Sequence, residues 1–225
     1  MFKLNENYEV DRKILKCDYV RYSPAETSTI NTPNSQIYIN IPREDSVISL
    51  LNSYLDLNFE VVKKADNSRY ANGNDIRLIN FGPIALFSNF KLSTSSGKHL
   101  EDVSHAHLVS LMYKLLTSNK DSDDLSIGFD RSRNRRRDEL AQNKNVKGKY
   151  HLKIMLKDVL GFAECQEKAT YGLGYKLTLT RNKDEAVIDK AAGIAGARVK
   201  IDHIRWYVPH YTPSVSQQTL LSNQL

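Results

Sequence analysis

Only two cysteines, Cys17 and Cys165, occur in the 225 residues, and a long stretch of chain separates them. Neither belongs to a CxxC pair or to a Cys/His spacing typical of zinc sites, so the sequence supports no disulfide pairing and no cysteine-bound metal. The chain also has no Asn-x-Ser/Thr acceptor, no apolar N-terminal signal core and no apolar run that approaches a membrane span. We therefore expect an intracellular protein that is not secreted.

A strong excess of either charge is missing as well. The 32 Lys and Arg residues are opposed by 26 Asp and Glu residues, which gives a net charge of +6 and a pI near 9.1. Such a mildly basic surface gives weak background affinity for polyanions and does not establish a nucleic-acid function. Hydrophobic residues make up 40% and charged residues 26% of the chain, as in an ordinary globular protein of one large or two small domains.

Apolar and polar residues alternate with a period of two over much of the chain. Residues 36–41 (QIYINI) place three isoleucines on one face, and residues 53–61 (SYLDLNFEV) alternate in the same way. Since successive side chains of a strand point to opposite faces, both segments are predicted to be half-buried strands. Further strands are predicted over residues 75–81, 84–92, 150–159, 174–182 and 198–208. About seven to eight strands, each with a polar face, predict an antiparallel sandwich or barrel.

Two local features modify this pattern. In residues 198–208 the apolar phase changes, which predicts a β-bulge near Asp202 and His203. In residues 102–118 the spacing is that of an amphipathic helix, with Asp102 as its N-cap. Its apolar residues recur at intervals of three and four, on the face expected to pack on the sandwich: Leu108, Leu111, Met112 and Leu115.

Five arginines stand within seven positions of the segment FDRSRNRRRDEL, residues 129–140: Arg131, Arg133, Arg135, Arg136 and Arg137. Guanidinium groups suit bidentate phosphate binding, so these residues are candidates for phosphate contacts. However, acidic residues flank the cluster, and no aromatic residue is interleaved with the arginines for base stacking. The sequence therefore favours a solvated loop or a subunit-contact loop over a nucleic-acid site.

No segment carries the pattern of a catalytic, cofactor or metal site. His99, His105 and His107 lie close in sequence, but His105 and His107 are two residues apart on the predicted helix and cannot face one point. Gly172 and Gly174 open a strand, whereas the dinucleotide-binding fingerprint opens a helix. Neither cysteine has a local His or Asn signature, and the chain has no G-x-S-x-G. The sequence thus supports neither an enzyme nor a bound cofactor or metal.

The one tryptophan lies in an aromatic segment, IRWYVPHYTPS, whose notable residues are Trp206, Tyr207, Pro209, Tyr211 and Pro213. Tryptophan and tyrosine combine apolar area with a polar group and are common at interfaces. The same pattern also fits a last strand whose tryptophan fills the core and whose prolines stop the sheet. On the residues alone, both interpretations stay open.

Several long segments resemble one known family. They are YINIPREDSVISLLNSYLDLNFEV, NDIRLINFGPIALFSNFKLSTSSGKHLEDVSHAHLVSLMYKLL, DSDDLSIGFDR, GKYHLKIMLKDVLGFAECQEKATYGLGYKLTLTRN and IRWYVPHYTPS. In order and wording, within about residues 36–218, they resemble the double jelly-roll-like proteins of virus-like elements in animal genomes. That family is similar to the major capsid proteins of Polinton-type and related double-stranded DNA viruses. The resemblance implies eight strands, conventionally B to I, in two facing four-stranded sheets. It also implies two such jelly rolls in tandem and three chains in a pseudo-hexagonal capsomer.

The resemblance sets expectations for the domains. Residues 1–35 would form an N-terminal arm and residues 36–210 the jelly-roll domain. Residues 211–225 would be a linker toward a second jelly roll, which this sequence, ending at Leu225, does not contain. The expected fold is all-β, an antiparallel eight-stranded jelly-roll sandwich with one helix and a long arginine-rich loop between strands. The aromatic segment around Trp206 would lie at the junction with the second domain.

The expected function follows from that fold. It is a structural, capsid-like module without catalysis, which assembles with itself or with a second jelly-roll half, in a virion or in the cytoplasm or nucleus of a host cell. No membrane partner is expected. The alternative is a β-sandwich binding module for nucleic acid, through the arginine-rich loop, or for a glycan.

Overall fold

The computed structural model describes residues 14–44, 46–70, 76–117, 149–190, 196–215 and 219. The strands are β1 (Ile14–Tyr22), β2 (Gln36–Ile41), β3 (Val47–Ile48), β4 (Tyr54–Lys63), β5 (Ile76–Leu78), β6 (Phe87–Thr94), β7 (His99–Ser104), β8 (Lys149–Met155), β9 (Thr170–Tyr171), β10 (Tyr175–Arg181), β11 (Ile188–Lys190) and β12 (Ala197–Pro213). The helical segments are α1 (Gly82–Ala85), α2 (Ala106–Thr117), α3 (Gly161–Cys165) and the 3-10 turns η2 (Leu156–Asp158) and η3 (Asp184–Ala186). Within these ranges, no helix has the length and apolar character needed to cross a membrane.

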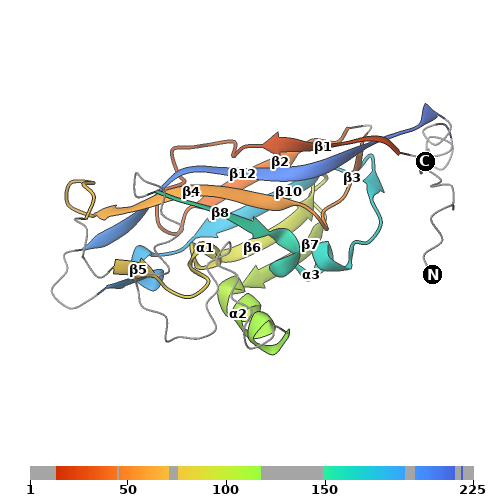
Figure 1. Ribbon diagram of the computed structural model, residues 1–225. Coiled ribbons are helices and arrows are strands. Elements are labelled where there is room, and N and C mark those ends of the chain that lie inside the picture. Colours follow the sequence, from red (N-terminus) through yellow and green to blue (C-terminus); the bar gives the residue numbers. More distant parts are fainter. Residues whose placement is uncertain are drawn as a thin grey trace, which may run out of the picture.

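Two antiparallel sheets face each other in the structure (Figure 1). In one sheet β8 pairs with β4, β4 with β12, and β12 with β1. In the other the order is β2-β10-β6-β7. When these eight strands are lettered B to I in chain order, the sheets become B-I-D-G and C-H-E-F, which is the jelly-roll arrangement. We name them the BIDG sheet and the CHEF sheet. The predicted eight-stranded jelly-roll sandwich is therefore confirmed.

The inner faces of the two sheets form the core. β2 alternates strictly between exposed and buried residues, as its sequence predicts. The large buried side chains of the CHEF sheet include Ile37, Ile39, Ile41, Phe90, Leu92, Leu177 and Leu179. Those of the BIDG sheet include Leu55, Leu57, Phe59, Leu152, Ile154, Val199, Ile201, Ile204, Trp206 and Val208. Full burial of one such side chain stabilises the fold by about 1.5–3 kcal/mol. The side chains that the predicted alternation turns inward therefore form most of the core of the sandwich.

The predicted bulge in the last strand is confirmed. The pairing of β12 with β4 shifts between Ile201 and His203, and Asp202 is exposed there. The extra residue allows both Ile201 and Ile204 to face the core although they are three positions apart. β12 therefore consists of two regular segments joined by the bulge, and the apolar side chains of both segments face the core.

The predicted helix exists but begins later than its sequence suggests. Residues His99–Ser104 form β7, and Asp102 lies opposite Lys91 of β6, so Asp102 as an N-cap is wrong. His105 has a left-handed φ of 54°, which turns the chain from β7 into α2. Its backbone N–H still donates to the carbonyl of Ser88, at 2.8 Å, so strand-like pairing continues up to the turn.

Two predicted strands are shorter than expected. Of residues 75–81, β5 covers only Ile76–Leu78, and it pairs with β11 in a small separate sheet. Residues 84–92 were expected to be continuous strand, but Gly82–Ala85 form α1, with Pro83 in the first turn. Proline suits that position because the first helical N–H groups have no partner within the helix. The strand β6 therefore starts only at Phe87.

β1 was not predicted from the sequence. It lies within residues 1–35, the segment expected to be an arm, and it pairs with β12 from Ile14 to Tyr22. At the other end, β12 continues past residue 210 to Pro213. Most of β1 is exposed on both faces, so its sequence lacks the alternation that marks a half-buried strand.

Candidate subunit interfaces

The arginine cluster lies between α2 and β8, outside the residues that the structure describes. Its five residues are Arg131, Arg133, Arg135, Arg136 and Arg137. Their expected contacts, with a neighbouring subunit or with phosphates, stay a prediction.

The aromatic segment around Trp206 belongs to β12. Trp206 is 0% exposed and fills the core between the sheets. Pro209 lies inside β12 and does not stop the sheet, whereas Pro213 is the last residue of β12, as one interpretation of the sequence expected. Pro209 is buried, and its carbonyl accepts a hydrogen bond from the backbone N–H of Ser49 at 3.3 Å. Tyr207 and Tyr211 are half-buried. A junction with a second domain at this segment stays a prediction.

Three tyrosines form an aromatic cluster on the outer face of the BIDG sheet. Tyr54 and Tyr207 are opposite each other on β4 and β12, and their rings stack with centroids 5.2 Å apart and planes at 12°. Tyr19 of β1 adds a third ring, 5.7 Å from Tyr54 and tilted by 46°. Tyr19 is half exposed, so the cluster reaches the surface. Tyrosine is enriched at the centres of protein interfaces, which makes this cluster a candidate contact site.

The ring of Tyr54 is enclosed by its neighbours. The ammonium group of Lys153, on β8, lies 4.9 Å from the ring centroid, in a cation–π contact. Desolvation by burial raises the pKa of the Tyr54 hydroxyl, and electrostatic interactions with Tyr207, Asp56 and Tyr19 raise it further. Tyr54 therefore stays neutral at physiological pH and presents a hydrogen-bonding hydroxyl rather than a charge.

The polar side of β4, predicted to face water, is largely covered. Asp56 is only 7% exposed, because His151 of β8 and His203 of β12 lie against it. Their Nε2 atoms are 2.5 Å and 3.4 Å from the two carboxylate oxygens. Glu60, farther along β4, is covered in the same way by two cationic side chains.

The carboxylate of Glu60, on β4, accepts hydrogen bonds at both of its oxygens. Arg69 donates two hydrogen bonds to Oε2 of Glu60, at 3.1 and 3.2 Å, and Lys200 donates to Oε1 at 3.2 Å. Buried carboxylates are tolerated when they are paired in this way. The outer face of the BIDG sheet is therefore an ordered polar and aromatic surface.

Helix α2 is attached to the body by small and polar residues. Ala106 and Ser110 are its buried residues. The hydroxyl of Ser110 donates to the carbonyl of Asp158 at 2.7 Å, and Lys114 forms an ion pair with the carboxylate of Asp158 at 3.5 Å. Tyr113 donates to Glu164 of α3 at 3.0 Å. These contacts fix the rotation of α2 about its own axis.

That rotation leaves the apolar side of α2 exposed. Its exposed residues are Leu108, Val109, Met112, Tyr113, Leu115 and Leu116, with Met112 at 63% and Leu116 at 83%. Of the four residues predicted to pack on the sandwich, only Leu111 packs against the core, so the predicted packing face is wrong for the other three. Contiguous exposed apolar side chains mark contact sites in soluble proteins. We call these six residues the α2 apolar surface.

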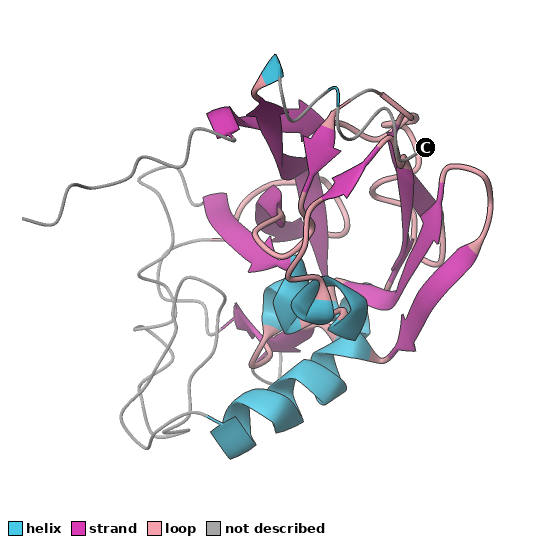
Figure 2. Ribbon diagram, turned by 90° about the vertical axis from the view of Figure 1, so that its right-hand side faces the viewer, coloured by secondary structure: helices cyan, strands magenta, loops and turns pink. Residues whose placement is uncertain are grey.

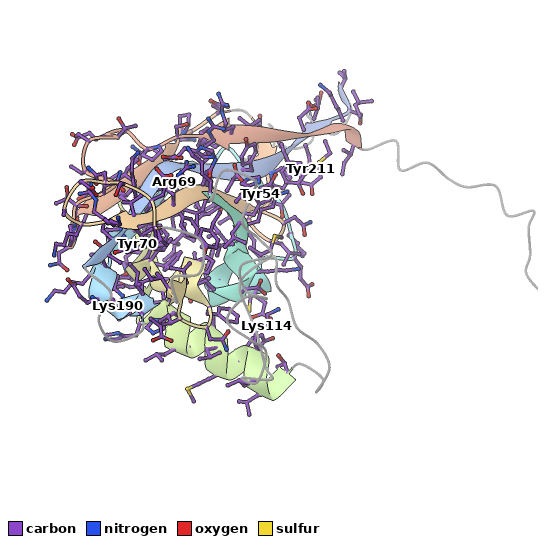
Figure 3. All side chains as sticks on the ribbon, turned by 60° about the vertical axis from the view of Figure 1, so that its left-hand side comes forward. Tyr54, Arg69, Tyr70, Lys114, Lys190 and Tyr211 are labelled. Carbon is purple, nitrogen blue, oxygen red and sulfur yellow. The ribbon has the colours of Figure 1, made fainter. Side chains whose placement is uncertain are left out.

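The aromatic cluster and the α2 apolar surface lie on different sides of the protein. α2 runs along one edge of the sandwich in the end-on view, with its far side turned away from the strands (Figure 2). With side chains drawn, Tyr54 and Tyr211 lie at the sheet that holds β1, β4 and β12, and Lys114 lies on α2 below (Figure 3). The two candidate contact sites are therefore separate.

The three histidines near α2 do not converge on a metal site. The Nε2 atom of His99 lies 3.9 Å from the carboxylate of Asp102, and His105 lies in the turn before α2. His107 is half-buried, and burial, together with the charge of His105, lowers its pKa. Across the part of the chain that the structure describes, no three or more His, Cys, Asp or Glu side chains are grouped to hold a metal ion.

Comparison with known proteins identifies the fold. No family model and no curated protein matches the sequence. Among solved structures, a chain of the Sputnik virophage aligns with a TM-score of 0.55 and 12% identity, over 95% of this chain and 51% of that chain. The Faustovirus major capsid protein aligns with a TM-score of 0.54 and 10% identity, over 98% and 58%. The PBCV-1 virus capsid aligns with a TM-score of 0.51 and 11% identity, over 96% and 46%.

These alignments cover nearly all of this chain but only about half of each solved chain. At such identities the likeness shows the fold alone. It agrees with the B-I-D-G and C-H-E-F strand order and with the resemblance found in the sequence. The protein thus has the jelly-roll fold of viral major capsid proteins, over about half the length of such a chain.

Proposed function

We propose that this protein is a structural, capsid-like jelly-roll module that acts through protein–protein assembly and not through catalysis. The fold and its capsid-protein neighbours support the structural role. The α2 apolar surface is the observation that carries the assembly role. An ordinary amphipathic helix buries its apolar side, because that side gains most from leaving water. Here polar contacts hold the apolar side outward, where a partner protein can cover it.

The finer features of the proposal come from the sequence resemblance. We propose that the relatives are Polinton-type capsid proteins of virus-like elements, and that the working unit is a trimeric capsomer. Its partner is another copy of the chain or a second jelly-roll half. The proposed location is the virion or the host cell in which it assembles.

The alternative, a module that binds nucleic acid or a glycan, finds little support at the aromatic cluster. Sequence-independent binding of single strands uses free aromatic ring faces on which bases stack. In the cluster, Tyr207 stacks on Tyr54 and Lys153 lies over the Tyr54 ring. The Tyr54 ring is therefore occupied by its neighbours and is not a free platform for a base.

Sedimentation velocity over a series of protein concentrations tests the assembly role. The wild-type protein is expected to associate as concentration rises. Changing Leu108, Met112 and Leu116 to Ser should weaken the association at least about tenfold, since each buried leucine is worth roughly 1.5–3 kcal/mol. The matched control is Leu173→Ser, which removes an exposed leucine outside α2 and should change nothing. If the triple variant and the wild type associate equally, α2 is not the contact.

A further inference from the structure

Strand β1 is the edge of the BIDG sheet. One of its edges pairs with β12 from Ile14 to Tyr22, and no other strand of the described chain pairs with the opposite edge. In Figure 1, β1 runs along the outside of the sandwich, next to β12. An open edge presents unpaired N–H and C=O groups and is a template for pairing with another chain. β1 is therefore a second surface at which copies can meet.

The register with β12 assigns the side chains of β1 to two faces. Val20 and Tyr22 lie opposite Val208 and Trp206, which are buried, so even-numbered residues face the inner side. Tyr19 belongs to the outer aromatic cluster, so odd-numbered residues face outward. Lys16 and Asp18 therefore share the inner side, whereas Cys17 is on the outer side.

Symmetry restricts how two copies of β1 can pair. In an antiparallel pair related by a twofold axis through the sheet, directly opposed residues lie on the same face, and the axis passes through one residue position. An axis at position 16 or 18 places Lys16 opposite a second Lys16, or Asp18 opposite a second Asp18, and like charges there are destabilising. An axis at position 17 places each Lys16 opposite the Asp18 of the other copy. An axis at position 19 or 20 places neither Lys16 nor Asp18 opposite a residue of opposite charge. Among axes at positions 16 to 20, only the one at Cys17 places Lys16 opposite Asp18.

We propose that two copies of this chain join through β1, in antiparallel register, with Cys17 opposite Cys17 of the partner subunit. The inference deepens the proposed assembly function, on which it rests, by naming the partner and the contact. The two BIDG sheets join edge to edge into one continuous sheet. In the single chain, Lys16 and Asp18 form an exposed ion pair within β1, at 2.6 Å. In the proposed dimer this pair is replaced by two ion pairs between the strands. The strand thus changes from an open edge to an interior strand.

Cysteine cross-linking tests the register, because the two cysteines of the chain are both free and exposed. Directly opposed Cα atoms in antiparallel strands are about 4.5–5.5 Å apart, within disulfide range. With oxidised glutathione as oxidant, two protein thiols become one disulfide, and glutathione disulfide takes up the two electrons and two protons as two thiols. The Cys165→Ser protein, which retains Cys17, should form covalent dimers at least about ten times faster than Cys17→Ser, which retains Cys165, because pairing raises the local concentration of the thiols.

Charge variants provide a second, independent readout. Lys16→Asp or Asp18→Lys alone, each in the Cys165→Ser background, creates like charges across the axis and should suppress both cross-linking and association. The double variant with both changes restores complementarity and should recover them. Equal cross-linking through Cys17 and Cys165, or a double variant no better than the single ones, overturns the proposal. If sedimentation shows assembly without Cys17 cross-linking, β1 is excluded and the assembly function stands; if no association occurs at any concentration, both fail.

Discussion

Arg181 and Asp184 form an ion pair inside the sandwich, with Nη2 of Arg181 2.7 Å from Oδ1 of Asp184. Arg181 is 1% exposed, and it also donates to the carbonyls of Leu86 and Asn182, at 3.1 and 2.9 Å. Burial lowers the pKa of Arg181, while the charge and hydrogen bond of Asp184 act in the opposite direction. The same Asp184 oxygen accepts from the backbone N–H of Val199 at 3.2 Å, so the pair joins the end of β10 to the start of β12.

Loss of Asp184 should destabilise the fold strongly. Asp184→Ala leaves the buried guanidinium of Arg181 without its counter-charge, which costs about 3–5 kcal/mol in the free energy of unfolding. Urea unfolding followed by circular dichroism measures this loss. The neighbouring Glu185, in an exposed ion pair with Lys64 at 3.6 Å, is the control, and Glu185→Ala should unfold at the same urea concentration as the wild type. Equal losses for both variants would contradict the buried role of the pair.

Trp206 and Tyr207 are neighbours in sequence on opposite faces of β12, and substitution of Trp206 should cost much more stability than substitution of Tyr207. Trp206→Ala leaves a large cavity in the core and is expected to cost about 3–5 kcal/mol of stability. Tyr207→Ala removes one stacked ring of the surface cluster, worth about 0.5–1.5 kcal/mol beyond its area. Urea unfolding of both variants gives the comparison. A larger loss for Tyr207→Ala would place the core on the wrong face of the strand.

Stability should fall in strongly alkaline solution partly because of Tyr150. Burial raises the pKa of the Tyr150 hydroxyl to about 12, whereas a tyrosine in the unfolded chain has a pKa of about 10. The unfolded chain therefore loses this proton first. The contribution is fully present below about pH 10 and is lost, by up to about 1.4 kcal/mol per pH unit, as pH rises toward 12. Tyr150→Phe should show a shallower decline of unfolding free energy between pH 9 and pH 11.5, relative to its own value at pH 8. Parallel curves for the two proteins would refute the assignment.

The arginine cluster is expected to contribute little to DNA binding. Changing Arg135, Arg136 and Arg137 to Ser should leave the slope of log affinity against log salt unchanged. The slope should agree, within experimental error, with that of a control variant that loses the same charge. That control changes three exposed lysines to Ser: Lys91, Lys157 and Lys168. Fluorescence anisotropy of labelled duplex DNA across a potassium chloride series gives both slopes. A slope smaller by roughly 2–3 in the arginine variant alone would identify a phosphate site, at about 0.9 per contact.

Much of the fold was predictable from the sequence, because one sheet face is buried and the other is not. The alternation in residues 36–41 and 53–61 located β2 and β4, and the phase change located the bulge at Asp202. β1 escaped detection for the converse reason: an edge strand exposed on both faces has no alternation to read. β7 was absorbed into the predicted helix because nothing in the side-chain pattern marks the left-handed turn at His105.

The candidate interfaces were harder to predict. The apolar residues of α2 have helical spacing, but Ala106, Ser110 and Lys114 do as well, at intervals of four. Which stripe faces the body depends on partners distant in sequence, such as Asp158 and Glu164. The covering of Asp56 by His151 and His203 depends on strand register in the same way. No local sequence pattern identifies such tertiary partners.

The position of β12 has a consequence for how the chain folds. Among the described strands it comes last in chain order, yet it lies in the interior of the BIDG sheet, between β1 and β4. Tyr22 meets Trp206 only after the residues between them have been synthesised. Closing so long a loop is entropically costly and makes for slow folding. On the ribosome, the edges of β1 and β4 that pair with β12 stay unpaired until β12 emerges, so β12 sets the pace at which the sandwich closes.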